Sequence, residues 1–280
     1  MVKNGSRKIP YDSPMPDISL FLKRHGLKLN TNLGQHFLAD DTVLEKIVEA
    51  AKIQPDDHVI EIGPGIGVLT VELLKATKNV TSIELDERLI PLLRKYIDAE
   101  GPKPGTYTFN VIQGNALNVP MPDHPYKIVA NIPYHITSPL LRHVFLESKI
   151  HPTSMTLLIQ REVADKICDT EKTGMLTIVV GLFGTPKKIV NVPPKAFLPP
   201  PAVDSAVIHI DCFPNPVADA ETIDEVLKLV KRGFTMKRKM LRNSFSTFPG
   251  GMERLEAASI DPSRRPETLT IAEWIAIARA

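Results

Sequence analysis

Apolar residues recur along the first two thirds of the chain with two spacings, which predict two kinds of element. Short, nearly continuous apolar runs predict buried strands within 58–63, 79–86, 107–117, 126–133 and 204–211. Apolar positions three and four residues apart predict helices within 41–53, 67–76, 87–98 and 138–148. The stretch 154–167 begins as a strand and continues as a helix. Because strands alternate with helices, we expect a doubly wound α/β fold, with a parallel sheet covered on both faces.

The pattern changes in the last third of the chain. Residues 191–216 contain seven prolines, and beyond Pro216 only helical patterns remain, at 223–234, 236–245 and 270–280. We therefore expect a domain boundary near Pro214–Pro216. The predicted parts are an N-terminal arm (1–30), an α/β domain (31–213) and a small all-helical C-terminal domain (217–280).

The composition fits a soluble globular protein. Hydrophobic residues make up 43% and charged residues 24% of the 280 residues. No apolar run reaches the roughly 20 residues that span a membrane, and the N-terminus lacks the pattern of a signal peptide. Cys168 and Cys212 are far apart, and no His, Cys and Asp cluster has metal-ligand spacing. We expect a reduced, cytoplasmic chain with no bound metal.

Three glycines follow the first predicted strand of the α/β domain. Gly63, Gly65 and Gly67 lie between this strand and a helix, and Glu84 ends the next strand about 20 residues later. Such a loop lets a ligand approach the carboxyl edge of the sheet, where the acid can accept both hydroxyls of a ribose. A plain turn is the alternative for the glycines alone. Together with Glu84 they predict a nucleoside-containing cofactor.

The choice of cofactor depends on Pro64. A dinucleotide carries a pyrophosphate that needs backbone N–H groups at the helix start, and Pro64 removes one of them. S-adenosylmethionine (SAM) carries no phosphate and fits this loop better than NAD. Asn115, after the third predicted strand, is placed to read an adenine edge, although a turn role is its alternative.

The stretch Asn131–Tyr134 predicts an amine-binding site. Pro133 ends the preceding strand and holds Ile132 extended. The side-chain oxygen of Asn131 and the carbonyl of Ile132 can then accept hydrogen bonds from the two N–H groups of an adenine amine, and Tyr134 can stack on the base. The base must be flipped out or already unpaired to reach them. A strand-end turn with a core tyrosine is the alternative.

These motifs together resemble those of the KsgA-type ribosomal RNA adenine N6,N6-dimethyltransferases. The resemblance covers about residues 32–208 and rests on the following stretches: NLGQHFL, EIGPGIGVLT, IELD, GNAL, NIPYHITSPLL, LLIQREVADKI and VPPKAFLPPPAVDSAVI. It implies a Rossmann-like class I methyltransferase domain that uses SAM. It also implies dimethylation of two adjacent adenosines in a hairpin loop near the 3′ end of small-subunit (16S) rRNA, during ribosome biogenesis.

The resemblance also implies individual roles, carried over by position. The implied SAM-site residues are His36, Leu38, Gly63, Gly65, Glu84, Asn115 and Asn131. The implied target-amine residues are Asn131, Ile132, Pro133 and Tyr134, with Phe197 stacking on the opposite face of the base. The family commonly has Asn at the position of His36 and often Asp at that of Asn115, and both replacements can still hydrogen-bond.

A basic run extends the resemblance into the helical part. Lys231, Arg232, Lys237, Arg238, Lys239 and Arg242 place six cations in twelve residues without an acid. Next to an RNA-modifying domain they predict phosphate contacts, with a solvated helix face as the alternative. The expected partner is the small ribosomal subunit, and the expected state is a monomer.

Three other functions remain open from the sequence. The first is the related large-subunit rRNA methyltransferase that confers macrolide resistance. The others are a non-catalytic nucleic-acid-binding relative, such as a mitochondrial transcription factor with this fold, and a dehydrogenase. The PPPAVDSAVI segment and the basic C-terminal part favour the small-subunit enzyme, and intact motifs at 63–67 and 131–134 favour activity.

Overall fold

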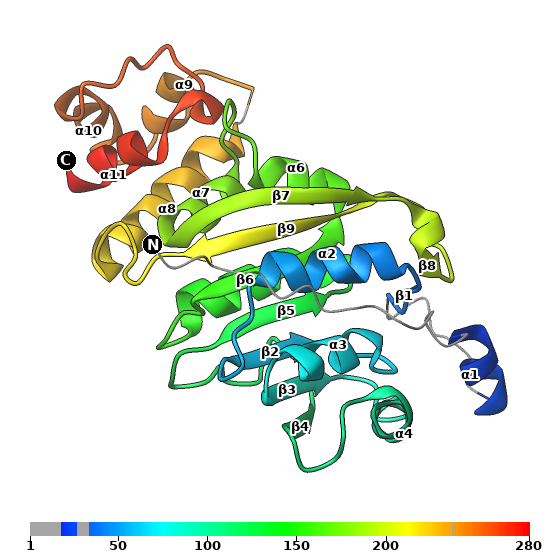
Figure 1. The fold of residues 1–280 in the computed structure, drawn as a ribbon. Coiled ribbons are helices and arrows are strands. Elements are labelled where there is room, and N and C mark those ends of the chain that lie inside the picture. The colour runs from blue at the N-terminus through cyan, green and yellow to red at the C-terminus, as the bar shows by residue number, and fades with distance from the viewer. Residues whose placement is uncertain (1–17, 27–33, 237) are drawn as a thin grey trace, which may run out of the picture.

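A seven-stranded sheet forms the centre of the molecule in the computed structural model, which describes residues 18–26, 34–236 and 238–280 (Figure 1). Its strands stand in the order β4-β3-β2-β5-β6-β9-β7. Their bounds are β2 (His58–Ile62), β3 (Asn79–Glu84), β4 (Thr108–Gln113), β5 (Lys127–Asn131), β6 (Ser154–Gln160), β7 (Gly184–Val192) and β9 (Ser205–Cys212). The predicted doubly wound α/β fold is confirmed.

Helices cover both faces of this sheet. They are α1 (Ile18–Arg24), α2 (Asp41–Ala51), α3 (Val68–Ala76), α4 (Ile90–Glu100), α5 (Thr137–Arg142), α6 (Arg161–Ile167) and α7 (Met175–Phe183). A π-helical turn (His143–Glu147) extends α5, and short 3-10 turns occupy Tyr134–Ile136 and Pro194–Ala196. Along β5 the buried side chains alternate between two cores, with Val129 on the side of α1 to α4 and Ile128 on the side of α5 to α7. Burial on both faces explains why the strands are nearly continuous apolar runs.

The sheet is not parallel throughout. β2, β3, β4, β5 and β6 pair in parallel, whereas β9 runs antiparallel to both β6 and β7. The predicted parallel sheet is therefore confirmed for β2 to β6. It was wrong for β9, which returns from the Pro-rich segment rather than from a crossover helix. Neither α7 nor β7 was predicted, because Met175–Phe183 is apolar all round and β7 alternates only weakly.

A second, two-stranded sheet lies beyond the carboxyl ends of the central strands. Here β1 (Phe37–Leu38) pairs antiparallel with β8 (Phe197–Leu198). The main-chain N–H of Ala39 extends this ladder by donating to the carbonyl of Ala196 at 2.7 Å. This small sheet joins the segment that precedes α2 to the Pro-rich segment, and its paired residues Leu38 and Phe197 are 159 positions apart in sequence.

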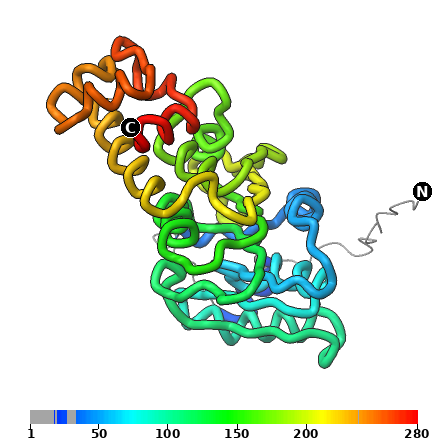
Figure 2. The backbone as a smooth tube through the Cα atoms, turned by 90° about the vertical axis from the view of Figure 1, so that its left-hand side faces the viewer, coloured from blue at the N-terminus to red at the C-terminus, as the bar shows by residue number. Residues whose placement is uncertain are grey.

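The C-terminal part is helical and stands at one end of the molecule (Figure 2). Its elements are α8 (Ala220–Thr235), α9 (Leu241–Phe245), α10 (Gly251–Ala257), a 3-10 turn (Pro266–Thr268) and α11 (Ile271–Arg279). Its buried Val226 and Trp274 belong to the same apolar cluster as Val179 of α7. The helical part thus packs onto the sheet's own helix layer, and the division at 214–216 stays a prediction.

One predicted helix was too long. The pattern over 236–245 predicts a single helix, but α9 begins only at Leu241, after a turn closed by Lys239 N–H donating to the Met236 carbonyl at 2.8 Å. The residues before Leu241 include Arg238 and Lys239, which are exposed and have no apolar face to bury against α8. Of the predicted arm, the structure describes 18–26, where Phe21 of α1 packs edge-on against Tyr96 of α4. Among the described residues no helix is long and apolar enough to cross a membrane.

Candidate active site

The candidate site lies where the strand order reverses, between β2 and β5. The chain runs outward from β2 to β3 and β4, then returns to the other side of β2 as β5. Ligands of open α/β sheets bind in the crevice that such a reversal opens at the carboxyl ends of the strands. Glu61 and Gly63 lie at the end of β2, and Asn131 ends β5. The residues that the sequence predicted for two separate tasks therefore meet at one place.

The glycine loop has the backbone that its sequence predicted. Gly63, Gly65 and Gly67 have φ of 68°, 60° and 103°, a region that other residues rarely adopt. A Cβ atom at Gly65 would also lie 2.5 Å from the ring of Phe37. The loop thus needs glycine both for its turn and for the close packing of Phe37 over it.

Glu84 fastens this loop to the end of β3. Its carboxylate accepts hydrogen bonds from the main-chain N–H of Gly65 at 3.1 Å and of Asp86 at 2.8 Å. The side chain is buried, and burial raises its pKa above the usual value. Each carboxylate oxygen keeps a second lone pair, so the group can still accept hydroxyl hydrogens from a ribose.

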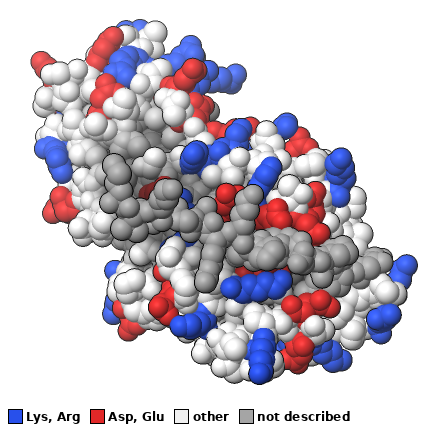
Figure 3. All heavy atoms as spheres, viewed as in Figure 1, with Lys and Arg blue, Asp and Glu red and all other residues white. Residues whose placement is uncertain are grey.

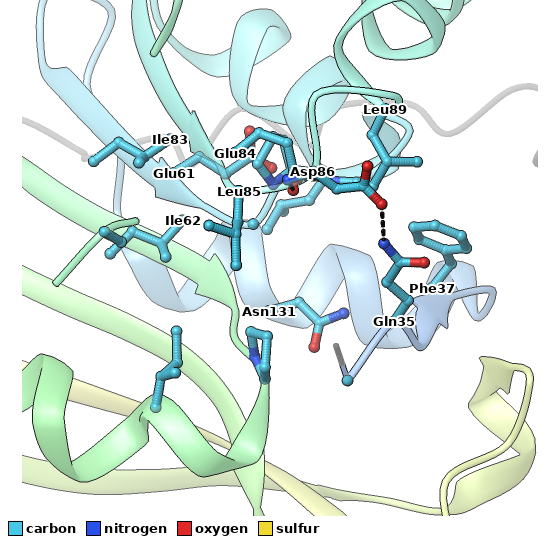
Figure 4. A pocket seen from close by; sticks show the side chains of 18 of the residues that line it. Gln35, Phe37, Glu61, Ile62, Ile83, Glu84, Leu85, Asp86, Leu89 and Asn131 are labelled. Carbon is cyan, nitrogen blue, oxygen red and sulfur yellow. Dashed lines mark hydrogen bonds between the residues drawn. The ribbon is translucent and has the colours of Figure 1, made fainter. Parts of the chain in front are cut away.

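A cavity of about 190 Å³ opens beside these groups. All predicted cofactor residues line it: His36, Leu38, Gly63, Gly65, Glu84, Asn115 and Asn131. Figure 4 shows the acidic residues Glu61, Glu84 and Asp86 on one side of the cavity and Asn131 across from them. The structure brings the set together, and its binding role stays a prediction.

Glu61 and Asp86 were not predicted as site residues. Both lie inside motifs that the sequence analysis quoted, and a carboxylate at or just beyond the carboxyl end of a central strand is the signal that could have identified them. Glu61 is 1% exposed; its Oε2 accepts from Thr70 and Ser82 at 2.7 Å each, while its Oε1 has no partner within the described residues. Burial raises the pKa of Glu61 to about 7.

The acidic lining distinguishes between the possible cofactors. A buried, unpartnered carboxylate oxygen is costly unless a donor or cation meets it. SAM brings an ammonium and a sulfonium, which suit Glu61, Glu84 and Asp86. The two phosphates of NAD would meet like charge at the same walls. The residues present therefore fit SAM.

Gln35 closes the cavity from the N-terminal side. Its Nε2 donates to Oδ2 of Asp86 at 2.8 Å, a bond drawn in Figure 4. Hydrogen bonds from Arg88 and Gln35 hold the pKa of Asp86 down to about 2, so this carboxylate remains ionised. Gly34, with φ of 72°, would place a Cβ 2.9 Å from the Pro133 side chain. The segment 34–38 is thus packed against both ends of the cavity.

The amide of Asn131 has a defined orientation. Its Nδ2 donates to the main-chain carbonyl of His36 at 3.1 Å, so its Oδ1 is the end left to accept. The Ile132 side chain is buried, and its carbonyl accepts none of the turn, cap or loop hydrogen bonds within the described residues. Pro133, with φ of −55° and ψ of 134°, keeps the backbone extended there. Two acceptors therefore lie on consecutive residues.

A second cavity, of about 240 Å³, adjoins the first. Ile132, Pro133, Tyr134 and Phe197 line it, and Asn131 and His36 line both cavities. The Tyr134 hydroxyl hydrogen-bonds Oγ of Ser205 at 2.5 Å, and burial raises the pKa of this tyrosine, so it stays a neutral phenol. The structure thus places both predicted stacking residues around one space that meets the first cavity at Asn131.

Asn115 has a turn role as well as a place in the cavity wall. Its Oδ1 accepts the main-chain N–H of Leu117 at 3.0 Å, which is the turn alternative from the sequence. Its Nδ2 is therefore the end that remains for a ligand. Both roles are compatible, and adenine contact stays a prediction.

The predicted RNA-contacting cations differ in their surroundings. Arg232 is engaged within the chain, since its Nε donates to the Ser244 carbonyl at 2.8 Å and its Nη2 to Oγ1 of Thr247. Exposed side chains occur at Lys231, Arg238, Lys239 and Arg242, and Lys237 lies outside the described residues. On the face drawn in Figure 3, Lys and Arg over the C-terminal helices are interspersed with Asp and Glu. Arg232 therefore has a structural task, and RNA contact by the run stays a prediction.

Solved structures share this fold across most of the chain. A dimethyladenosine transferase from Plasmodium falciparum is 29% identical with a TM-score of 0.76, covering 86% of this chain and 96% of that one. The 23S rRNA methyltransferase ErmE is 26% identical with a TM-score of 0.70, covering 87% and 98%.

Relatives in sequence are more similar still. Proteins named ribosomal RNA small subunit methyltransferase A are 40% identical in Dehalococcoides mccartyi (94% of this chain, 91% of that one) and 38% identical in Clostridium botulinum (90% and 94%). The profile of the family described as ribosomal RNA adenine dimethylase matches residues 26–280. The chain therefore belongs to the ribosomal RNA adenine dimethylase family.

Proposed function

We propose that this protein uses SAM to dimethylate the N6 amines of two adjacent adenosines in a 3′-terminal hairpin loop of small-subunit (16S) rRNA, during ribosome biogenesis. One observation carries the proposal: the acid-lined cavity and the second cavity meet at Asn131, which lines both. A donor in the first cavity and a base in the second would then approach each other at the side chain that accepts from the reacting amine.

The chemistry needs acceptors rather than a strong base. The lone pair of adenine's amine is delocalised into the ring, and the nitrogen must become pyramidal as it attacks. Asn131 Oδ1 and the Ile132 carbonyl can accept hydrogen bonds from the two N–H groups of this amine. Both acceptors are oriented before the substrate arrives. SAM supplies an activated methyl group on its sulfonium. Tyr134 and Phe197 hold the base between them, with stacking worth roughly 1–3 kcal/mol per base.

The substrate must present an extruded base. An adenine inside a helix cannot reach the cavity that Phe197 and Tyr134 line, whereas a hairpin loop offers unpaired bases. The cations Lys231, Arg238 and Lys239 would contact phosphates of the same RNA, through a C-terminal domain that begins after Pro216. The protein acts as a monomer on a small-subunit particle in the cytoplasm.

The small-subunit substrate is favoured over the large-subunit one. Relatives at 36–40% identity carry the small-subunit name, whereas ErmE, named for 23S rRNA, is 26% identical. The acidic cavity disfavours a dehydrogenase. The paired acceptors at Asn131 and Ile132 disfavour a non-catalytic RNA-binding protein, which would have no need to orient them.

The experiment compares three substrates. The protein is incubated with methyl-labelled SAM and small subunits that lack the modification, large subunits, or deproteinised small-subunit rRNA. We expect label in the small-subunit particles, confined to two adjacent adenosines. Label in large subunits would establish the alternative substrate, and no label in any of them would refute the enzymatic proposal.

A further inference from the structure

His36 lies in the wall between the two cavities. It lines both of them, and its Nδ1 lies 2.7 Å from the main-chain carbonyl of Pro199. A carbonyl can only accept, so the imidazole donates this hydrogen bond from Nδ1. Pro199 follows β8 directly, two residues after Phe197. The side chain of His36 therefore holds in place the segment that contributes Phe197 to the second cavity, which we call the base cavity.

The backbone of the same residue serves the other side of the reaction. The His36 carbonyl accepts from Nδ2 of Asn131, which orients the acceptor oxygen of that amide. The next two residues pair with β8, with Phe37 opposite Leu198 and Leu38 opposite Phe197. One residue thus contacts both Asn131 and the segment that carries Phe197.

The segment 34–38 is also part of the first cavity. Gln35 bonds Asp86, and Phe37 packs on Gly65 so closely that only glycine fits there. A ligand in this cavity therefore contacts the segment that holds His36. A ligand that binds one arrangement of a segment better than others shifts the population toward that arrangement.

We propose that His36 is a positioning residue that couples the two cavities. When the methyl donor orders segment 34–38, the hydrogen bond from His36 Nδ1 to the Pro199 carbonyl also orders Phe197 and the base cavity that Phe197 lines. The inference rests on the proposed function. It predicts that donor and RNA each tighten the binding of the other by the same factor, because coupling between two sites is reciprocal. A factor of at least about 5 is typical of such coupling.

Two substitutions of similar shape separate the hydrogen bond from the shape of the side chain. In His36→Asn the amide nitrogen can take the place of Nδ1 and still donate. In His36→Asp an acceptor faces the Pro199 carbonyl instead. His36→Ala removes the donor without adding charge, and it serves if the aspartate variant melts at a lower temperature than the wild type.

The measurement is co-sedimentation of the protein with unmethylated small subunits, with and without S-adenosylhomocysteine. We expect this compound to tighten binding at least about fivefold for the wild type and His36→Asn. We expect no tightening for His36→Asp and His36→Ala. Calorimetry without RNA measures the affinity of each of the four proteins for S-adenosylhomocysteine. The sedimentation is then run with every protein saturated with this compound, so that a change in donor affinity alone leaves the tightening factor unchanged.

The inference is overturned if His36→Asp and His36→Ala keep the wild-type factor, if His36→Asn loses it, or if the wild type shows none. It is also overturned if the aspartate and alanine variants differ from the wild type only in donor affinity. Methyl transfer by the wild type to the same subunits is scored in parallel. Transfer without coupling refutes this inference alone, whereas a wild type that neither binds nor methylates the subunits refutes the proposed function.

Discussion

The amide of Asn131 and the main-chain carbonyl of His36 are joined by a 3.1 Å hydrogen bond between residues 95 positions apart. The bond decides which end of the amide is free, because the nitrogen is the donor and the oxygen remains an acceptor. The strand β5 delivers Asn131 to this place, and the pairing of β1 with β8 delivers His36. The oxygen that we propose as the acceptor for the reacting amine is thus oriented by the fold itself.

Replacing Asn131 should remove most methyl transfer. Asn131→Ala eliminates an acceptor that matters chiefly in the transition state, so turnover at saturating substrate should fall more than tenfold, or about 1.4 kcal/mol. Single-turnover transfer to small subunits measures this effect, and circular dichroism checks the fold. Thr137→Ser, a few residues further along, is the control for a conservative change nearby. Turnover of Asn131→Ala within tenfold of the wild type would show that the amide has a different role.

The sequence predicted the site better than it predicted the sheet edge. Gly63, Glu84 and Asn131 each lie at the end of a strand. The hydrophobic pattern of the sequence predicts where each strand ends, and the residue type there indicates its task. The link from His36 to Pro199 could not be predicted, because it depends on which distant segments pair beyond the sheet. The antiparallel direction of β9 was missed for the same reason, since strand direction depends on tertiary connection rather than on local pattern.

Changing Asn115 to aspartate should tighten SAM binding. The Asn115 Oδ1 accepts from Leu117, which leaves the amide nitrogen for the adenine edge. Adenine's own amine is a donor, so a carboxylate oxygen at that position offers the better partner. Asn115→Asp should lower the Kd for SAM several-fold, about 0.5–1.5 kcal/mol. Titration calorimetry measures it, and a Kd equal to or higher than that of the wild type would place the adenine edge elsewhere.

Glu61 should make stability depend on pH. Its folded-state pKa of about 7 exceeds the usual 4.5, so the folded protein holds this proton more tightly than the unfolded chain. Its contribution to stability is therefore present below pH 4.5 and is lost as pH rises through 7. As pH rises from 4.5 to 8, the free energy of unfolding of Glu61→Gln should increase relative to that of the wild type by on the order of 3 kcal/mol.

Urea unfolding without SAM at both pH values measures this difference. The same substitution at Glu45, on the exposed side of α2, is the matched control. An unchanged difference between Glu61→Gln and the wild type at the two pH values would mean that Glu61 does not hold its proton in the folded state.

The basic run should contribute RNA affinity without chemistry. Each phosphate contact adds roughly −0.7 to −0.9 to the slope of log K against log salt. Changing Lys237, Arg238 and Lys239 together to Gln should weaken binding to small subunits and flatten this slope, while SAM affinity stays unchanged. Arg94→Gln with Lys95→Gln, exposed on α4, is the control. A wild-type slope in the triple variant would favour a solvated surface.

The most direct test of the account counts methyl groups on their substrate. Small subunits that lack the modification are incubated with this protein and SAM, and the nucleosides of their rRNA are quantified by mass spectrometry after the modified positions are mapped. We expect N6,N6-dimethyladenosine at two adjacent positions near the 3′ end, which is about four methyl groups per subunit because each of the two flipped adenosines receives two. Methylation confined to large subunits, to a different base, or to another atom of adenine would contradict it.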